Sequence, residues 1–163
     1  MSTLWTHDRR FDCSQAELYR LLQTPEFEQT LGQKMELNTE TMDREETSDG
    51  VRLTLRVLSN RKLPAFMHGL VGKHNGWIEI RHWRDEICGY DWEVRTLSER
   101  IPIQASGVVR VDAAGADGAV RHAEGTFEAK VPLIGRKIEG YLVQRTDLAF
   151  DTSAGILRNM LSG

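Results

Sequence analysis

The feature that most constrains the fold is a change of hydrophobic period at Pro132. Between residues 35 and 131, apolar and polar side chains alternate in six segments separated by turn residues, which predicts antiparallel strands. After Pro132, apolar residues recur at helical spacing and predict a helix of up to roughly 40 Å. A long amphipathic helix must bury its apolar stripe, and a curved sheet with one apolar face is the partner that this sequence supplies.

The six segments are predicted to form three hairpins. Turn residues of the kind found in tight hairpins separate the members of each pair. The pairs and their turns are residues 35–46 and 51–59 around Asp49-Gly50, residues 77–84 and 87–95 around Asp85-Glu86, and residues 103–111 and 120–131 around Gly115 and Asp117-Gly118. In the first hairpin, the alternation along residues 51–57 predicts one face toward solvent and one buried face.

The start of the chain predicts one strand and two short helices. Residues 4–11 alternate loosely, as a strand would, and Ser14 with Glu17 forms the capping-box pattern of a helix start. Thr24-Pro25 begins a second helix that is expected to end near Gly32. The expected fold is therefore α+β, with about seven antiparallel strands curved around a long C-terminal helix. No linker or repeat interrupts residues 1–163, so a single domain is expected.

Composition argues against several classes of protein. A formal net charge of -3, without a Lys/Arg patch, argues against a nucleic-acid-binding protein. The cysteines and histidines have no metal-binding spacing, and nucleotide-binding motifs are missing, so no metal or other cofactor is predicted. The polar start of the chain and the lack of an apolar run of ~20 residues predict a cytoplasmic protein without a membrane span. The sequence does not indicate an oligomeric state.

One cation interrupts the apolar stripe of the C-terminal helix. On a helical wheel that starts at Ile134, Arg145 lies about 20° from the start, near the middle of the stripe. Two explanations are open. Arg145 forms a structural salt bridge or extends to the helix edge, or its guanidinium binds a carboxylate or phosphate of a ligand.

The middle hairpin provides further charges for the same region. If Asp85 and Glu86 form a two-residue turn, Arg81 lies opposite Tyr90 and Glu79 opposite Trp92. The aromatic residues favour turning this face inward, which would place Glu79 and Arg81 beside the cation of the long helix. A register slip of one residue would instead turn both charges to solvent.

The strings LPAFMHGLVG and VPLIGRKIEGYL, with the order of the elements, resemble the START-like (SRPBCC) superfamily over the whole chain. More narrowly, they are similar to a bacterial START-like family of unknown function. The resemblance implies a helix-grip fold, in which the sheet wraps around the C-terminal helix and a hydrophobic ligand such as a lipid, fatty acid, sterol or quinone binds between them. It implies no single reaction, because members include carriers, cyclases, hormone receptors and co-chaperone domains.

The leading hypothesis is a non-catalytic carrier or sensor of a hydrophobic small molecule. Its expected ligand-binding residues lie on the inner face of the sheet, on the long helix and in the apolar insert: Leu53, Leu55, Phe66, Leu70, Glu79, Arg81, Tyr90, Trp92, Ile138, Tyr141, Leu142 and Arg145. One alternative is an enzyme of the polyketide-cyclase or dehydratase type, with Glu79, His82, Tyr90 or Arg145 in acid-base roles. No catalytic residue is predicted, because the sequence defines no acid-base pair.

The apolar insert at residues 63–72 leaves a further alternative open. It is expected either to cover one end of the sheet as a short helix, or to act as a lid that contacts membranes or partner proteins transiently. In a protein-interaction domain, the insert would dock a partner and the core would be filled by side chains.

Overall fold

The computed structural model describes residues 2–71, 75–97 and 102–163, without the side chains of residues 70 and 71. Its elements follow the order expected from the sequence. They are β1 (Thr3–Phe11), α1 (Gln15–Leu22), α2 (Pro25–Met35), β2 (Leu37–Thr47), β3 (Gly50–Ser59), η1 (Ala65–Met67), α3 (His68–Val71), β4 (Gly76–Arg84), η2 (Asp85–Ile87), β5 (Gly89–Thr96), β6 (Ile103–Ala113), β7 (Ala119–Ala129) and α4 (Gly135–Ser162).

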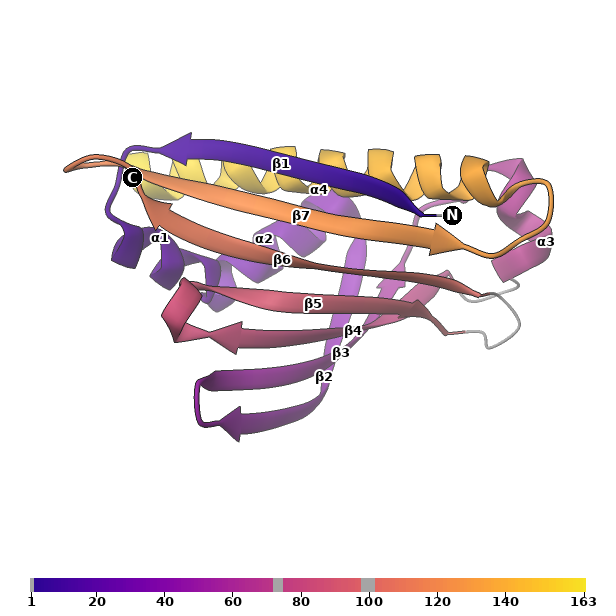
Figure 1. Cartoon of the computed structure of the whole chain (residues 1–163), viewed down its shortest axis with the longest axis horizontal. Coiled ribbons are helices and arrows are strands. Elements are labelled where there is room, and N and C mark those ends of the chain that lie inside the picture. Colours follow the sequence, from indigo (N-terminus) through magenta and orange to yellow (C-terminus); the bar gives the residue numbers. More distant parts are fainter. Residues whose placement is uncertain (1, 72–74, 98–101) are drawn as a thin grey trace.

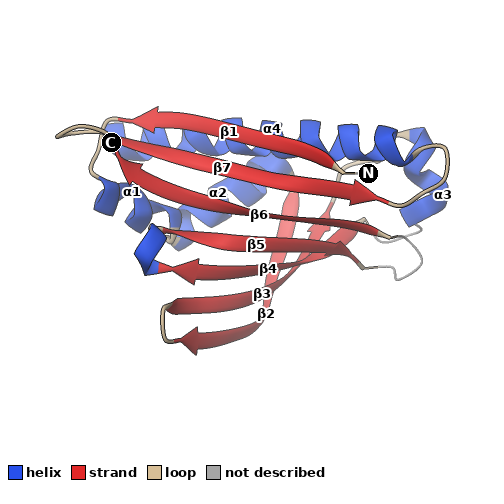
Figure 2. Cartoon of the chain, viewed as in Figure 1, coloured by secondary structure: helices blue, strands red, loops and turns tan. Residues whose placement is uncertain are grey.

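The seven strands form one antiparallel sheet in the order β1-β7-β6-β5-β4-β3-β2. Strands β2 to β7 are a meander, and β1 joins it beside β7. Figures 1 and 2 show the helices on one side of the strands, with α4 running along β1 and β7 in the same direction as β1. This arrangement is the helix-grip fold, and the predicted fold class is confirmed.

The two short helices begin where the sequence predicts. The Ser14 hydroxyl accepts a hydrogen bond from the Glu17 amide at 3.1 Å, and Thr24 caps α2 through the Phe27 amide in the same way. The predicted end of α2 at Gly32 is wrong, because the helix continues to Met35. Met35 is buried, so packing of the last turn outweighs the weak helix propensity of one glycine.

Two turns differ from the sequence prediction. Thr47 pairs with Gly50, so the turn between β2 and β3 is one residue earlier than Asp49-Gly50. Between β4 and β5, η2 and Cys88 replace the predicted two-residue turn, and Cys88 adopts a left-handed conformation with φ 48°. Arg81 therefore lies opposite Trp92, two residues away from the predicted register. A shift of two residues leaves each side chain on its predicted face.

The buried side of α4 matches the predicted stripe only in part. Ile138 and Ile156 are buried, as members of the predicted stripe of Ile138, Tyr141, Leu142, Leu148, Ala149, Thr152, Ile156 and Met160. Glu139, Ser153 and Leu157 lie outside that stripe but are buried, whereas Leu148, a member of the stripe, is 44% exposed. The helix packs against β1 and β7 on one side and against α2 on another, so it buries a wider arc than one sheet would require. No helix among the described residues is long and apolar enough to cross a membrane.

Candidate functional site

Three charged residues and one tyrosine lie together on the inner side of the sheet. We call them the inner ion cluster: Glu28, Glu79, Arg81 and Tyr90. Arg81 Nε donates to the Glu79 carboxylate, and Arg81 Nη1 donates to Glu28 Oε1 on α2 at 2.5 Å. The guanidinium also lies 5.5 Å from the centre of the Tyr90 ring. The cluster thus joins β4, β5 and α2.

The side chains of the inner ion cluster are largely buried but remain accessible to solvent. The side chains of Arg81 and Glu79 retain 15% and 17% exposure, and Glu28 retains 37%. Burial opposes the charge of Arg81, but Glu79 and Glu28 outweigh that effect and raise its pKa above the ordinary value. Arg81 is therefore charged at neutral pH, and solvent still reaches all three side chains.

Tyr90 contributes a neutral hydroxyl to the cluster. Burial, opposed in part by Arg81, raises the pKa of Tyr90 to about 12. The phenol therefore keeps its proton at neutral pH and can donate or accept a hydrogen bond. Within the described part of the chain, the Tyr90 hydroxyl has no hydrogen-bond partner. It is not one of the fully buried unpaired atoms, so solvent can reach it.

An apolar region continues from the cluster along the sheet. Trp92 is 7% exposed, and its ring lies over Gly107 of β6 and Gly125 of β7, where a Cβ atom would approach the ring to 2.6 Å and 2.4 Å. Its indole Nε1 is buried and has no hydrogen-bond partner in the described part of the chain. Val94 and Leu142 pack against the same group of residues while remaining partly exposed.

The remaining predicted apolar residues fall into two groups. Ile138 is buried at the start of α4, and Phe66, Tyr141 and Leu142 pack around it. The rings of Phe66 and Tyr141 meet edge to face, with their centres 6.4 Å apart. Near the other end of the sheet, Leu53 packs on the core below α1 and α2, and Leu55 is buried with 4% exposure.

The insert at residues 63–72 covers one end of the sheet. Met67 is buried, and Leu63 and Phe66 pack against the start of α4. Lys137 of α4 lies 4.4 Å above the Phe66 ring. The side chain of Leu70 and all of residue 72 lie outside what the structure describes. The predicted membrane contact of this segment stays a prediction.

Arg145 does not join the charges with which the sequence placed it. It is half-buried on α4, and no hydrogen bond or ion pair engages it within the described ranges. The third charged group beside Glu79 and Arg81 is Glu28, and not Arg145 as predicted. The reason is the rotation of α4 toward β1 and α2, which a helical wheel of one element does not reveal.

His82 lies on the opposite face of the sheet from the cluster. Its neighbours on β4, Arg81 and Trp83, point inward, so His82 points outward and bonds Asp49 at 2.9 Å. It lines an outer groove of about 490 Å³, beside a second outer groove of about 590 Å³ that contains Ile78 and Ile80. This position removes His82 from the set of residues considered for the enzyme alternative.

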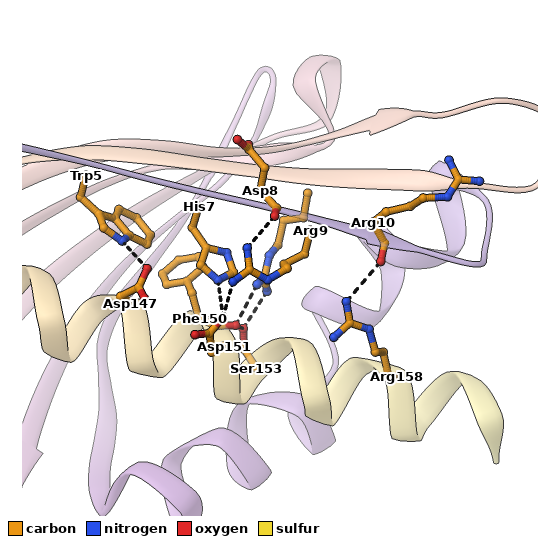
Figure 3. A network of polar contacts seen from close by, with 11 residues as sticks. Trp5, His7, Asp8, Arg9, Arg10, Asp147, Phe150, Asp151, Ser153 and Arg158 are labelled. Atoms are coloured by element: carbon orange, nitrogen blue, oxygen red, sulfur yellow. Dashed lines mark hydrogen bonds and ion pairs between the residues drawn. The ribbon is translucent and has the colours of Figure 1, made fainter.

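Sequence reasoning missed a polar network between β1 and α4, which we call the polar clasp: Trp5, His7, Arg9, Asp147 and Asp151 (Figure 3). Trp5 Nε1 donates to Asp147 at 3.0 Å, and both His7 Nε2 and Arg9 Nη2 donate to Asp151, at 2.8 and 2.7 Å. These hydrogen bonds lower the pKa of the Asp151 carboxyl, with His7 as the largest cause. The alternation of residues 5, 7 and 9 was the available signal for an inward row.

Sequence reasoning also missed the arginine that is fully buried. Arg121 of β7 is 1% exposed and bonds the Ser153 hydroxyl at 2.7 Å and the Phe150 carbonyl at 3.0 Å. Among the residues that the structure describes, none accepts a hydrogen bond from Arg121 Nε and no carboxylate forms an ion pair with the guanidinium. Burial lowers the pKa of Arg121 to about 10. The alternation along β7, which places Arg121 on the same face as Ala119, Ala123 and Phe127, was the available signal.

No group of three or more metal-ligating side chains is present among the described residues. The inner side of the sheet therefore offers a neutral phenol, three charged groups and an apolar surface. These groups can hold and orient a molecule that is apolar over most of its length and polar at one end.

Comparisons with known proteins agree with this fold. Over residues 6–161 the sequence matches the family described as protein of unknown function (DUF2505). No curated protein matches the sequence. A START superfamily protein from Mycobacterium smegmatis is similar in structure, with a TM-score of 0.59 at 11% identity, over 94% of this chain and 98% of that one.

Two solved enzymes share the fold at similar distance. One is the Zhui aromatase/cyclase from Streptomyces sp. R1128, with a TM-score of 0.59 at 11% identity over 98% of this chain and 90% of that one. The other is norcoclaurine synthase from Thalictrum flavum in complex with dopamine and hydroxybenzaldehyde, with a TM-score of 0.62 at 14% identity over 96% of this chain and 86% of that one. At these identities the likeness establishes the fold and no activity. The chain belongs to the DUF2505 family, which is described as a protein of unknown function.

Proposed function

We propose that the protein binds a hydrophobic small molecule with one polar end, between the inner face of the sheet and α4. The observation that carries this proposal is the partial exposure of Glu79 and Arg81 on the inner side of a central strand. Charges in a filled core would be sealed and costly, whereas charges that line a ligand site stay accessible when the site is empty.

The surroundings of the cluster support an apolar body for the ligand. Leu142 remains partly exposed although it packs against the clusters around both Trp92 and Ile138. At ~0.8 kcal/mol per buried CH2 group, a ten-carbon segment would contribute on the order of 8 kcal/mol before the costs of association. Burial energy of that size is enough for a carrier to bind its ligand usefully, even if it catalyses no reaction.

The comparisons lend support of a coarser kind. One solved neighbour is named as an aromatase/cyclase, and another was solved in complex with dopamine and hydroxybenzaldehyde. Both names concern small molecules with aromatic rings. For this chain they support a small-molecule ligand and leave the choice between carrier and enzyme to experiment.

The test is native mass spectrometry of the protein purified from a lipid-rich host, followed by identification of any molecule released on denaturation. We expect a stoichiometric apolar compound in the wild type. Leu142→Trp should lose it, because the larger ring would fill the space that the ligand needs. Leu148→Trp, on the exposed side of the same helix, is the matched control and should retain it.

Two results would contradict the proposal. A bare protein mass from several hosts, together with no binding of added apolar compounds, would indicate a filled core and favour a protein-interaction domain. A compound retained equally by Leu142→Trp and the wild type would show that it binds elsewhere, for instance in an outer groove.

A further inference from the structure

The charge balance of the inner ion cluster restricts the chemistry of the polar end of the ligand. Arg81 carries one positive charge, and Glu79 and Glu28 each carry one negative charge, so these three groups sum to one negative charge. An arginine already held by two carboxylates is a poor site for a third, because the incoming anion meets like charges at short range.

The unused hydrogen-bonding positions of the cluster are mostly acceptors. Arg81 occupies Oε2 of Glu79 and Oε1 of Glu28, which leaves the other oxygen of each carboxylate without a protein donor among the described residues. Among the described residues, the Tyr90 hydroxyl likewise has no hydrogen-bond partner. Within the described ranges Arg81 Nη2 also lacks a protein acceptor, but a carboxylate bound there would lie close to both glutamates.

Charged groups from neighbouring elements do not reverse this balance. Arg121 of β7 lies near Tyr90, but its side chain is sealed at 1% exposure and bonds Ser153 and Phe150. Arg145 of α4 has no ion pair within the described ranges, and it is not among the main influences on the pKa of Arg81 or Tyr90. The cluster therefore presents a net negative, acceptor-rich surface.

We propose, on the basis of the function proposed above, that the polar end of the ligand is a hydrogen-bond donor without negative charge, a hydroxyl or an ammonium group. It binds the free oxygen of Glu79 and the hydroxyl of Tyr90, and the two glutamates exclude carboxylates and phosphates. This assignment reverses the expectation from the sequence that an anionic end binds Arg145.

The experiment compares three ten-carbon compounds that differ only at one end: decanol, decylamine and decanoate. Each displaces the neutral dye Nile red from the full-length protein at neutral pH, and the midpoint concentration is measured. Decanol and decylamine should displace the dye at concentrations about tenfold lower than decanoate, because only decanoate brings a like charge to the cluster.

A variant of the cluster gives the decisive contrast. Glu79→Gln keeps the size of the side chain and removes one negative charge, so decanoate should gain several-fold in apparent affinity and decylamine should lose several-fold. Glu93→Gln makes the same charge change on the exposed outer face of β5 and should leave the three midpoints in their wild-type order. Circular dichroism confirms that both variants are folded.

The outcomes separate this inference from the proposed function. If Nile red binds and decanoate displaces it best, ligand binding stands and the donor assignment is wrong. If that preference disappears in Arg145→Gln, the anion site belongs to Arg145. If neither the dye nor any of the three compounds binds, by fluorescence and by calorimetry, the proposed function fails and the inference fails with it.

Discussion

At the scale of single residues, two arginines on neighbouring parts of one sheet face show how environment decides the energetic effect of a buried charge. Arg81 has two carboxylates, and its pKa is raised. Arg121 has a hydroxyl, a carbonyl and two aromatic rings, and burial lowers its pKa to about 10. The same side chain is thus stabilised as a cation at one position and destabilised as a cation at the other.

Replacing each arginine by methionine should change stability in opposite directions. Arg121→Met should raise the free energy of unfolding by about 1 to 3 kcal/mol, because a well-packed apolar side chain removes an unpaired buried charge. Arg81→Met should lower it by on the order of 2 kcal/mol, because Glu79 and Glu28 would be left close together without a cation. Urea denaturation at neutral pH measures both values.

The opposite result has a clear meaning. If Arg121→Met is as destabilising as Arg81→Met, the hydrogen bonds to Ser153 and Phe150 outweigh the cost of burying the charge. In that case Arg121 is a stabilising contact of α4.

At the scale of elements, α4 is held against the edge strand β1 because the hydrogen-bonding residues of the helix and of the strand recur at nearly the same spacing. Asp147 and Asp151 are one helical turn apart, which is about 6 Å at 1.5 Å per residue. Their partners Trp5 and His7 are alternate residues of β1, about 6.6 Å apart. Because α4 and β1 run in the same direction (Figure 3), successive turns of the helix meet successive inward residues of the strand.

Near the start of α4, Glu139 makes a further contact between the helix and the sheet. Its carboxylate accepts from the Thr3 hydroxyl at 2.6 Å and from the Ala129 amide at 3.0 Å. Burial opposes the charge of Glu139, but these two hydrogen bonds outweigh it and lower the pKa of the carboxyl. Through these contacts Glu139 joins α4 to both β1 and β7.

The polar clasp should make stability dependent on acid. The pKa of Asp151 is lower in the folded state than in the unfolded state, so its contribution is present above the ordinary carboxyl pKa of about 4 and is lost as the pH falls below that value. Asp151→Asn should therefore be less stable than the wild type at neutral pH, and the difference should shrink toward pH 3. Urea denaturation over this pH range measures the effect.

A control comes from the exposed turn between β6 and β7. Asp117→Asn changes a carboxylate that has no hydrogen bond to any described residue, and it should follow the wild-type curve throughout. A constant difference between Asp151→Asn and the wild type at all pH values would contradict the assigned role of the Asp151 charge.

At the scale of the whole molecule, small residues on β6 and β7 let the large side chains of other strands fill the inner side of the sheet. Trp5, Gly125, Gly107, Trp92 and Arg81 are successive register partners across β1, β7, β6, β5 and β4. The two glycines accept the Trp92 ring, which in turn lies beside Arg81 of the inner ion cluster. The position of the proposed ligand site thus depends on the whole width of the sheet.

Adding one methyl group in this row should move the indole ring. In Gly125→Ala the new Cβ would lie 2.4 Å from the Trp92 ring, so the ring must shift, and the free energy of unfolding should fall by about 1 to 3 kcal/mol. Thermal unfolding and tryptophan fluorescence report the two effects. Gly155→Ala on the exposed side of α4 meets no atom within 4 Å and should be neutral or stabilising.

An unchanged fluorescence spectrum and melting temperature in Gly125→Ala would show that the row tolerates the methyl group. Trp92 would then not be fixed by the two glycines, and the position of the inner ion cluster would not depend on them.

The sequence by itself determined the elements and their order. Hydrophobic period two, turn residues and the N-caps Ser14 and Thr24 act between residues that are near neighbours in the chain, so they are readable without a structure. The same local rules placed Glu79 and Arg81 on the inner face, because alternation assigns faces even when the register is wrong by two.

Only the tertiary structure decided which charges meet. Glu28 and Arg81 are 53 residues apart, and Arg121 and Ser153 are 32 apart, so neither pair is visible in a local pattern. The rotation of α4 about its axis is set by packing against β1, β7 and α2 together, and that rotation separated Arg145 from the cluster predicted for it. Periodicity fixes where a side chain lies on its own element, whereas its partners depend on how whole elements pack against one another.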